Sequence, residues 1–111
     1  MPRPIPSSLR PALDAYAVRL RAIFGERLRE LRLFGSYSRN EAHEDSDVDV
    51  LVLVEGLTDR EIGIVANEAV YTMIDTGVPV SPLPMSTDRL EQLRRGERLL
   101  AKDLDTEGIP L

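Results

Sequence analysis

Two aspartates one residue apart, Asp47 and Asp49, stand at the head of a strongly apolar run, Val48 to Val54, that reads VDVLVLV. Side chains alternate along a strand, so the two carboxylates are expected on one side, with Cα atoms about 6 to 7 Å apart. Carboxylates this close repel each other unless a cation lies between them. Oxygen ligands without His or Cys suit Mg²⁺ or Mn²⁺ better than zinc. The pair predicts a divalent-metal site, and the alternative is a solvated strand edge.

A Gly-Ser pair, Gly35 and Ser36, precedes the two aspartates by ten intervening residues. If a short helix opens at Ser36, its first N–H groups are free to bind an anion, and glycine lets a phosphate approach the backbone closely. Arg39 lies one helical turn beyond Ser36 and is expected to reach either a phosphate or an Asp carboxylate. These three residues predict a phosphate-binding site, and the alternative for Gly-Ser is an ordinary turn.

A phosphate site beside a divalent-metal site is the minimum that nucleotidyl transfer requires. The cation orients the triphosphate, offsets negative charge at the α-phosphorus and favours the departure of pyrophosphate. This combination depends on the two motifs lying together, so the strand before Gly35 and the strand after Asp47 must be neighbours in the sheet.

The elements that would position these residues alternate between helix and strand. Apolar residues at helical spacing predict a helix from Leu9 to Phe24, capped by Ser8 and ended by Gly25. Strands are predicted at Leu31–Phe34 and Asp47–Val54. The second strand is apolar on both faces, so it is expected in the middle of the sheet.

The second half of the chain continues this alternation. A helix is predicted from a cap at Thr58 or Asp59 to near Gly77, and the segment GVPVSPLPM (77–85) is predicted to be an edge strand because proline cannot donate to a ladder. Thr87 is expected to cap a last helical region, broken near Gly96. The apolar face of the earlier helix comprises Ile62, Val65, Ala66, Ala69, Val70 and Met73. That of the last region comprises Leu90, Leu93, Leu99, Leu100 and Leu104.

Length and composition narrow the class of protein. The 111 residues predict one small α/β domain, residues 1–111, with a mixed α+β arrangement. The net charge of −5 argues against generic nucleic-acid binding, which needs clustered Lys and Arg. The chain has no cysteine, and no apolar run approaches the roughly 18 residues of a membrane span. A cytoplasmic protein without membrane contact is expected.

The Gly-Ser pair, the ten-residue interval and an Asp-Val-Asp that runs into a hydrophobic strand resemble the signature of the minimal nucleotidyltransferases, in the polymerase-beta-like nucleotidyltransferase superfamily. The flanking residues agree, with LFGS at the first motif, Glu41-Ala42 within the interval and Ser46 before the Asp pair. The resemblance implies a small mixed β-sheet packed with helices, a nucleoside triphosphate as donor and Mg²⁺ or Mn²⁺ as cofactor. Gly35, Ser36 and Arg39 would bind phosphate, and Asp47 and Asp49 would be the catalytic metal ligands.

One feature of the family is missing. Members typically carry a third carboxylate on the following strand, but residues 76–87, TGVPVSPLPMST, contain neither Asp nor Glu. Glu55 lies on the expected face but about 20 Å farther along the strand than Asp49. Three interpretations stay open: a two-Asp enzyme assisted by substrate phosphates, a metal-dependent nucleotide binder, or a binding module that has kept only the fold.

The resemblance also suggests a partner. Minimal nucleotidyltransferases are often encoded beside an all-helical HEPN-domain protein and act as the antitoxin of a toxin-antitoxin pair. In some pairs they move AMP from ATP onto a tyrosine of the toxin. The resemblance therefore implies AMP transfer from ATP to an acceptor hydroxyl, with a HEPN-type toxin as the candidate acceptor. The alternative is a weakened or inactive antitoxin that only binds this partner.

Overall fold

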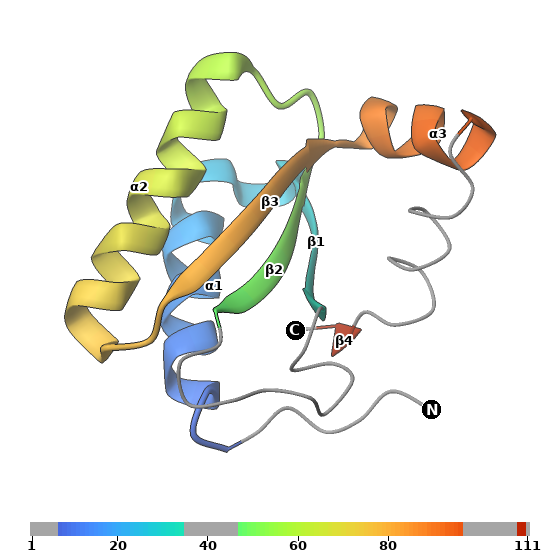
Figure 1. Ribbon diagram of the computed structural model, residues 1–111. Coiled ribbons are helices and arrows are strands. Elements are labelled where there is room, and N and C mark those ends of the chain that lie inside the picture. The colour runs from blue at the N-terminus through green and yellow to red at the C-terminus, as the bar shows by residue number, and fades with distance from the viewer. Residues whose placement is uncertain (1–6, 35–46, 97–108, 111) are drawn as a thin grey trace.

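The computed structural model describes residues 7–34, 47–96 and 109–110. In these ranges, three α-helices pack on a four-stranded sheet with the strand order β3-β2-β1-β4 (Figure 1). The helices are α1 (Arg10–Phe24), α2 (Asp59–Thr76) and α3 (Thr87–Gly96), and η1 (Gly25–Arg27) is a single 3-10 turn. The strands are β1 (Leu28–Phe34), β2 (Val48–Val54), β3 (Val80–Ser86) and β4 (Ile109–Pro110).

The sheet is mixed, which confirms the predicted α+β arrangement. Strand β1 is antiparallel to both β2 and β4, whereas β2 and β3 are parallel. Strand β2 is therefore central, as its two apolar faces predicted. Strand β3 is an edge of the sheet, as its prolines predicted. Strand β1 is longer than predicted because Leu28 to Glu30 also pair with β2, across an irregularity in register. The short strand β4 was not predicted.

One face of the sheet is covered by α1 and α2, which lie side by side in Figure 1. The four valines of β2 point to this face and are fully buried. They pack with Leu13, Tyr16 and Leu20 of α1 and with Val65 and Ala69 of α2. Full burial of one such side chain stabilises the fold by about 1.5 to 3 kcal/mol relative to exposure, so this cluster is the main core.

The hydroxyl of Tyr16 ties the two covering helices together. It is buried and donates a 3.0 Å hydrogen bond to the backbone carbonyl of Val65. Burial, with a smaller contribution from nearby Glu68, raises the pKa of Tyr16 well above its usual range. Tyr16 thus stays protonated, and its hydroxyl keeps the hydrogen that it donates to Val65.

A second, smaller core lies on the other face of the sheet. Leu51 and Leu53 of β2 pack there with Met85 of β3 and with Leu90 and Leu93 of α3. The predicted contact residues of α3 are therefore confirmed as far as Leu93, whereas Leu99, Leu100 and Leu104 lie outside the described residues.

Helix α2 buries a narrower stripe than its apolar pattern predicts. Val65, Ala69 and Thr72 are buried, but Ile62, Val70 and Met73 are 40 to 47% exposed, and Ala66 is exposed. The helix packs against β3 at the edge of the sheet, so its outer side extends beyond the last strand. Ile23, near the end of α1, is also exposed.

The helix ends follow the predicted signals in part. Gly25 and Gly77 end α1 and α2 with positive φ angles of 57° and 77°, which glycine adopts without strain. The predicted cap at Ser8 is wrong, since α1 begins after Leu9 without a side-chain cap. Pro11 stands in its first turn, where a missing N–H costs no intrahelical bond.

The predicted cap of α3 is wrong by one residue. Thr87 is already the first residue of the helix, and the hydroxyl of Ser86 accepts the N–H of Arg89 at 3.0 Å. Ser86 is thus both the last residue of β3 and the cap of α3, which leaves no loop between the two elements.

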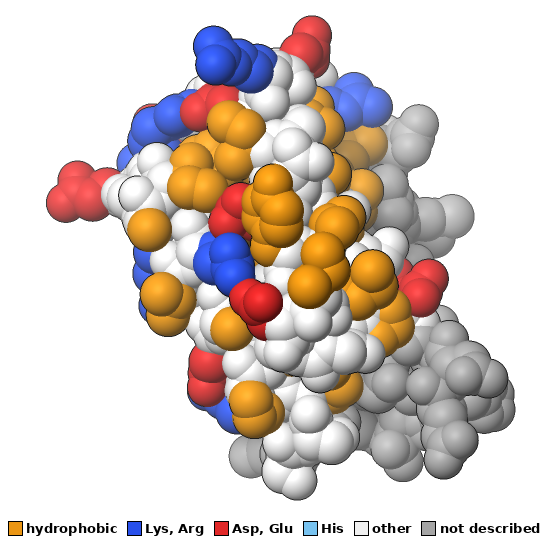
Figure 2. Space-filling view, turned by 90° about the vertical axis from the view of Figure 1, so that its left-hand side faces the viewer, with side chains coloured by type: hydrophobic (Ala, Val, Ile, Leu, Met, Phe, Trp, Pro, Cys, Tyr) orange, Lys and Arg blue, Asp and Glu red, His pale blue; other side chains and the backbone are white. Residues whose placement is uncertain are grey.

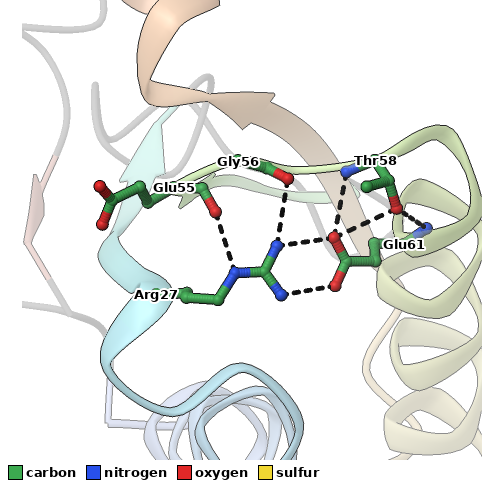
Figure 3. Close-up of polar contacts among 5 residues, drawn as sticks. All are labelled: Arg27, Glu55, Gly56, Thr58 and Glu61. Carbon is green, nitrogen blue, oxygen red and sulfur yellow. Dashed lines mark hydrogen bonds and ion pairs between the residues drawn. The ribbon is translucent and has the colours of Figure 1, made fainter.

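Arg27 and Glu61 join the far end of β2 to α2 (Figure 3). The guanidinium of Arg27 donates to the carbonyls of Glu55 and Gly56 and contacts both carboxylate oxygens of Glu61 at 2.7 Å. Glu61 in turn accepts the N–H of Thr58 and completes a capping box at the start of α2. The Arg27 hydrogen bonds and the Thr58 N–H lower the pKa of Glu61 to about 2.

We expect this network to make the stability of the fold depend on pH. The pKa of Glu61 is lowered by folding from 4.5 to about 2, so its contribution is present above about pH 4.5 and is lost as the pH falls toward 2. Glu61→Gln should lower the unfolding midpoint at pH 7, and the gap to wild type should narrow at pH 2.5. Circular dichroism melts at both pH values test this. A gap of equal size at the two values would contradict the assignment.

Candidate active site

The predicted metal ligands lie where β2 begins. Asp49 is the second residue of β2 and is half-buried, while Asp47 precedes the strand and is exposed. Between them, Val48 is fully buried under α1 and α2, and its N–H donates to the carbonyl of Pro79 at 2.9 Å. Because side chains alternate along β2, Asp49 leaves the sheet on the side of Leu51, away from Val48. That Asp47 shares this side stays a prediction.

Asp49 lies between the two neighbouring strands of the sheet. It pairs with Phe34, the last residue of β1, and with Ser81, the second residue of β3. The residue after Phe34 in the chain is Gly35, so β1 ends beside Asp49, one residue before the Gly-Ser motif. The condition that the two motif-bearing strands be neighbours is therefore met.

The predicted phosphate-binding residues Gly35, Ser36 and Arg39 lie outside the described residues, as does the short helix predicted at Ser36. Their assignment stays a prediction that the position of Phe34 supports.

A cavity of about 340 Å³ opens between α2 and the start of β3. Asp47 and Ser81 line it together with an apolar wall, made up of Ala66, Ala69, Val70, Met73, Pro79, Val80 and Pro82. The apolar pattern of α2 predicted that its members of this wall belong to the core, and no sequence signal identified Ser81. The only signal for the cavity was the row of prolines, which marked β3 as an edge that no further strand covers.

The family model described as nucleotidyltransferase domain matches residues 17–106, which include both aspartates and all of β3. The chain belongs to this nucleotidyltransferase family. The match and the mixed sheet agree with the fold that the resemblance implied.

Two curated relatives carry names that specify the reaction further. "Protein adenylyltransferase MntA" of Thermococcus cleftensis is 58% identical over 40 residues, covering 36% of this chain and 38% of the relative. "Putative protein adenylyltransferase MJ1305" of Methanocaldococcus jannaschii is 34% identical over 74 residues, covering 64% of this chain and 50% of the relative. The chain thus spans half or less of the length of these relatives in the matched regions.

The donor set of this nucleotidyltransferase fits one hard cation. Among the described residues, no three His, Cys, Asp or Glu side chains come together as a metal site. Asp47 and Asp49 supply oxygen only, which suits Mg²⁺ or Mn²⁺ bound by one or two carboxylates with the remaining positions filled by phosphate and water. Ser81, the partner of Asp49 on the neighbouring strand, carries a neutral hydroxyl rather than a carboxylate.

Two other carboxylates of the described region, Glu55 and Asp75, have partners elsewhere. Glu55 lies beyond the opposite end of β2 and forms an ion pair with Arg29. Asp75, near the end of α2, pairs with Arg19. The predicted position of Glu55, far from Asp49 along β2, is confirmed.

No helix within the described ranges combines the length and hydrophobicity that a bilayer crossing requires.

Proposed function

We propose that this nucleotidyltransferase transfers AMP from ATP to an acceptor hydroxyl in a reaction that requires Mg²⁺ or Mn²⁺. The proposal is supported most strongly by the position of Asp49. It lies between Phe34, which leads into Gly35 and Ser36, and Ser81 at the edge of the cavity. The end of β1 that leads to Gly35, the two aspartates and the cavity thus lie at one end of the sheet.

Each group of residues has one task in this proposal. Gly35, Ser36 and Arg39 hold the triphosphate, and Asp47 and Asp49 hold the cation, which when bound offsets negative charge on the phosphates. The acceptor oxygen forms a bond to the α-phosphorus, the bond to the bridging oxygen breaks, and pyrophosphate leaves. The proton of the acceptor passes to a nearby carboxylate or to water.

The acceptor in this proposal is a protein. Both relatives are named as protein adenylyltransferases, and the resemblance to minimal nucleotidyltransferases suggests a HEPN-type toxin as the partner. With no cysteine in the chain, the cytoplasm is the proposed compartment.

A second candidate function is a binding module that holds the HEPN-type partner without chemistry. Ser81 in place of a carboxylate favours it, and so does an exposed apolar strip on the helical side of the molecule (Figure 2). The strip comprises Val18 of α1 with Val70, Tyr71, Met73 and Ile74 of α2, all more than 40% exposed. Exposed apolar surfaces of this kind are common at sites of protein association.

Calorimetric titration of ATP with Mg²⁺ tests the proposed site. The double variant Asp47→Asn, Asp49→Asn should bind at least about ten-fold more weakly than wild type, because the cation loses both carboxylate ligands. Glu55→Gln is the matched control, since it removes a negative charge at the opposite end of β2 and should bind like wild type. Equal affinity of the double variant and wild type, with equal unfolding midpoints, would contradict the assignment.

Labelled ATP separates the two candidate functions. Incubation with a HEPN-type protein encoded beside this chain should transfer label from the α-phosphate, but not from the γ-phosphate, to that protein. The double variant should form the same complex without transferring label. A stable complex in which wild type transfers no label would favour the binding module over the enzyme.

A further inference from the structure

We propose that Ser81 occupies the place of the third metal ligand, and that its neutral hydroxyl makes cation binding in this chain depend on the phosphates of the nucleotide. The inference rests on the proposed function, because it takes Asp47 and Asp49 as the other ligands. It assigns a role to a residue that no motif in the sequence identifies.

The register of the sheet places Ser81 beside Asp49. The two residues are partners in the parallel pair β2 and β3, and neighbouring strands lie about 4.7 to 4.9 Å apart. Side chains alternate between the two faces along β3, and this alternation gives the direction of the Ser81 side chain. Val80 packs against the α1 and α2 core, whereas Leu83 packs against the α3 core, so Ser81 shares the face of Leu83. Asp49 lies on the same face of β2.

The cavity brings Ser81 near the other proposed ligand as well. Asp47 and Ser81 both line it, and Ser81 is only partly buried. A side chain at position 81 is therefore adjacent to Asp49 by strand pairing, and Asp47 lies at the same end of the sheet. A carboxylate at this position would lie beside Asp49 on the same face of the sheet.

Two carboxylates and a hydroxyl bind a cation more weakly than three carboxylates do, because the third ligand adds no negative charge. Mg²⁺ in such sites is completed by phosphate oxygens and water. Wild type is thus expected to bind Mn²⁺ weakly when the cation is supplied alone and much more tightly when ATP is present.

The deciding experiment is titration of Mn²⁺ alone, followed by the loss of the free-ion signal in electron paramagnetic resonance. Ser81→Asp should bind Mn²⁺ at least about ten-fold more tightly than wild type, since a charged oxygen ligand replaces a neutral one. Adding Asp47→Asn and Asp49→Asn to this variant should remove the gain.

Ser86→Asp is the matched control. It makes the same change on the same strand, about 16 Å away along β3, opposite Val54 at the far end of β2. Asp caps a helix as well as Ser does, so α3 should keep its cap. Its affinity for Mn²⁺ should match wild type.

A second pair of variants keeps the test valid if Ser81→Asp fails to fold. Cysteine is close to serine in size, and the chain has no other cysteine. Ser81→Cys should bind Cd²⁺ at least about ten-fold more tightly than Ser86→Cys, with the ultraviolet absorption of a thiolate–cadmium bond, because thiolates bind soft cations strongly.

The outcomes separate this inference from the proposed function. Folded Ser81 variants that gain no affinity, or gain no more than the Ser86 controls, would overturn the role of Ser81 even if ATP binding depends on the Asp pair. A gain in Mn²⁺ affinity that requires Asp47 and Asp49 would support it. If wild type nevertheless binds no ATP with Mg²⁺, the ligand assignment stands and the proposed function fails.

Discussion

The burial of β2 on both faces is the constraint on which the rest of the structure depends. Its valines are fully buried under α1 and α2, and Leu51 and Leu53 are enclosed by β3 and α3. A strand held from both sides has little freedom to shift or rotate. The residue at its start, Asp49, is therefore fixed between Phe34 and Ser81, although its own side chain is polar and half-buried.

The two ends of β2 have opposite roles. At the far end, Arg27 and Glu61 connect the loop after β2 to the capping box of α2, and every polar group in this network has a charged or backbone partner. At the near end, the carboxylates of Asp47 and Asp49 stand beside a neutral Ser81 and an apolar cavity. The polar contacts at the far end stabilise the fold, whereas the near end is where we propose that the cation and the nucleotide bind.

Sequence patterns predicted the features that depend on the residues of a single segment, such as the position of a strand in the sheet and the ends of helices. Apolar residues on both faces identified β2 as central, prolines identified β3 as an edge, and Thr58 and the glycines marked the ends of helices. The exposure of Val70 and Met73 was not predictable, because helical periodicity shows which side chains share a face but not where the sheet beneath them ends. The position of Ser81 depends on the register between β2 and β3, which is set by long-range packing. The family signature predicted which residues form the site, whereas only the strand pairing shows that Phe34 and Ser81 are the neighbours of Asp49.

The most direct test of the central claim is to locate the bound cation in solution. Mn²⁺ and ATP, added in small amounts to ¹⁵N-labelled protein, broaden the amide resonances of residues close to the metal ion. We predict broadening at Val48, Asp49 and Ser81, and sharp signals at Val54 and Ser86, about 16 Å or more along the strands. Broadening centred elsewhere, or unchanged by Asp47→Asn and Asp49→Asn, would contradict a metal–nucleotide site at the start of β2.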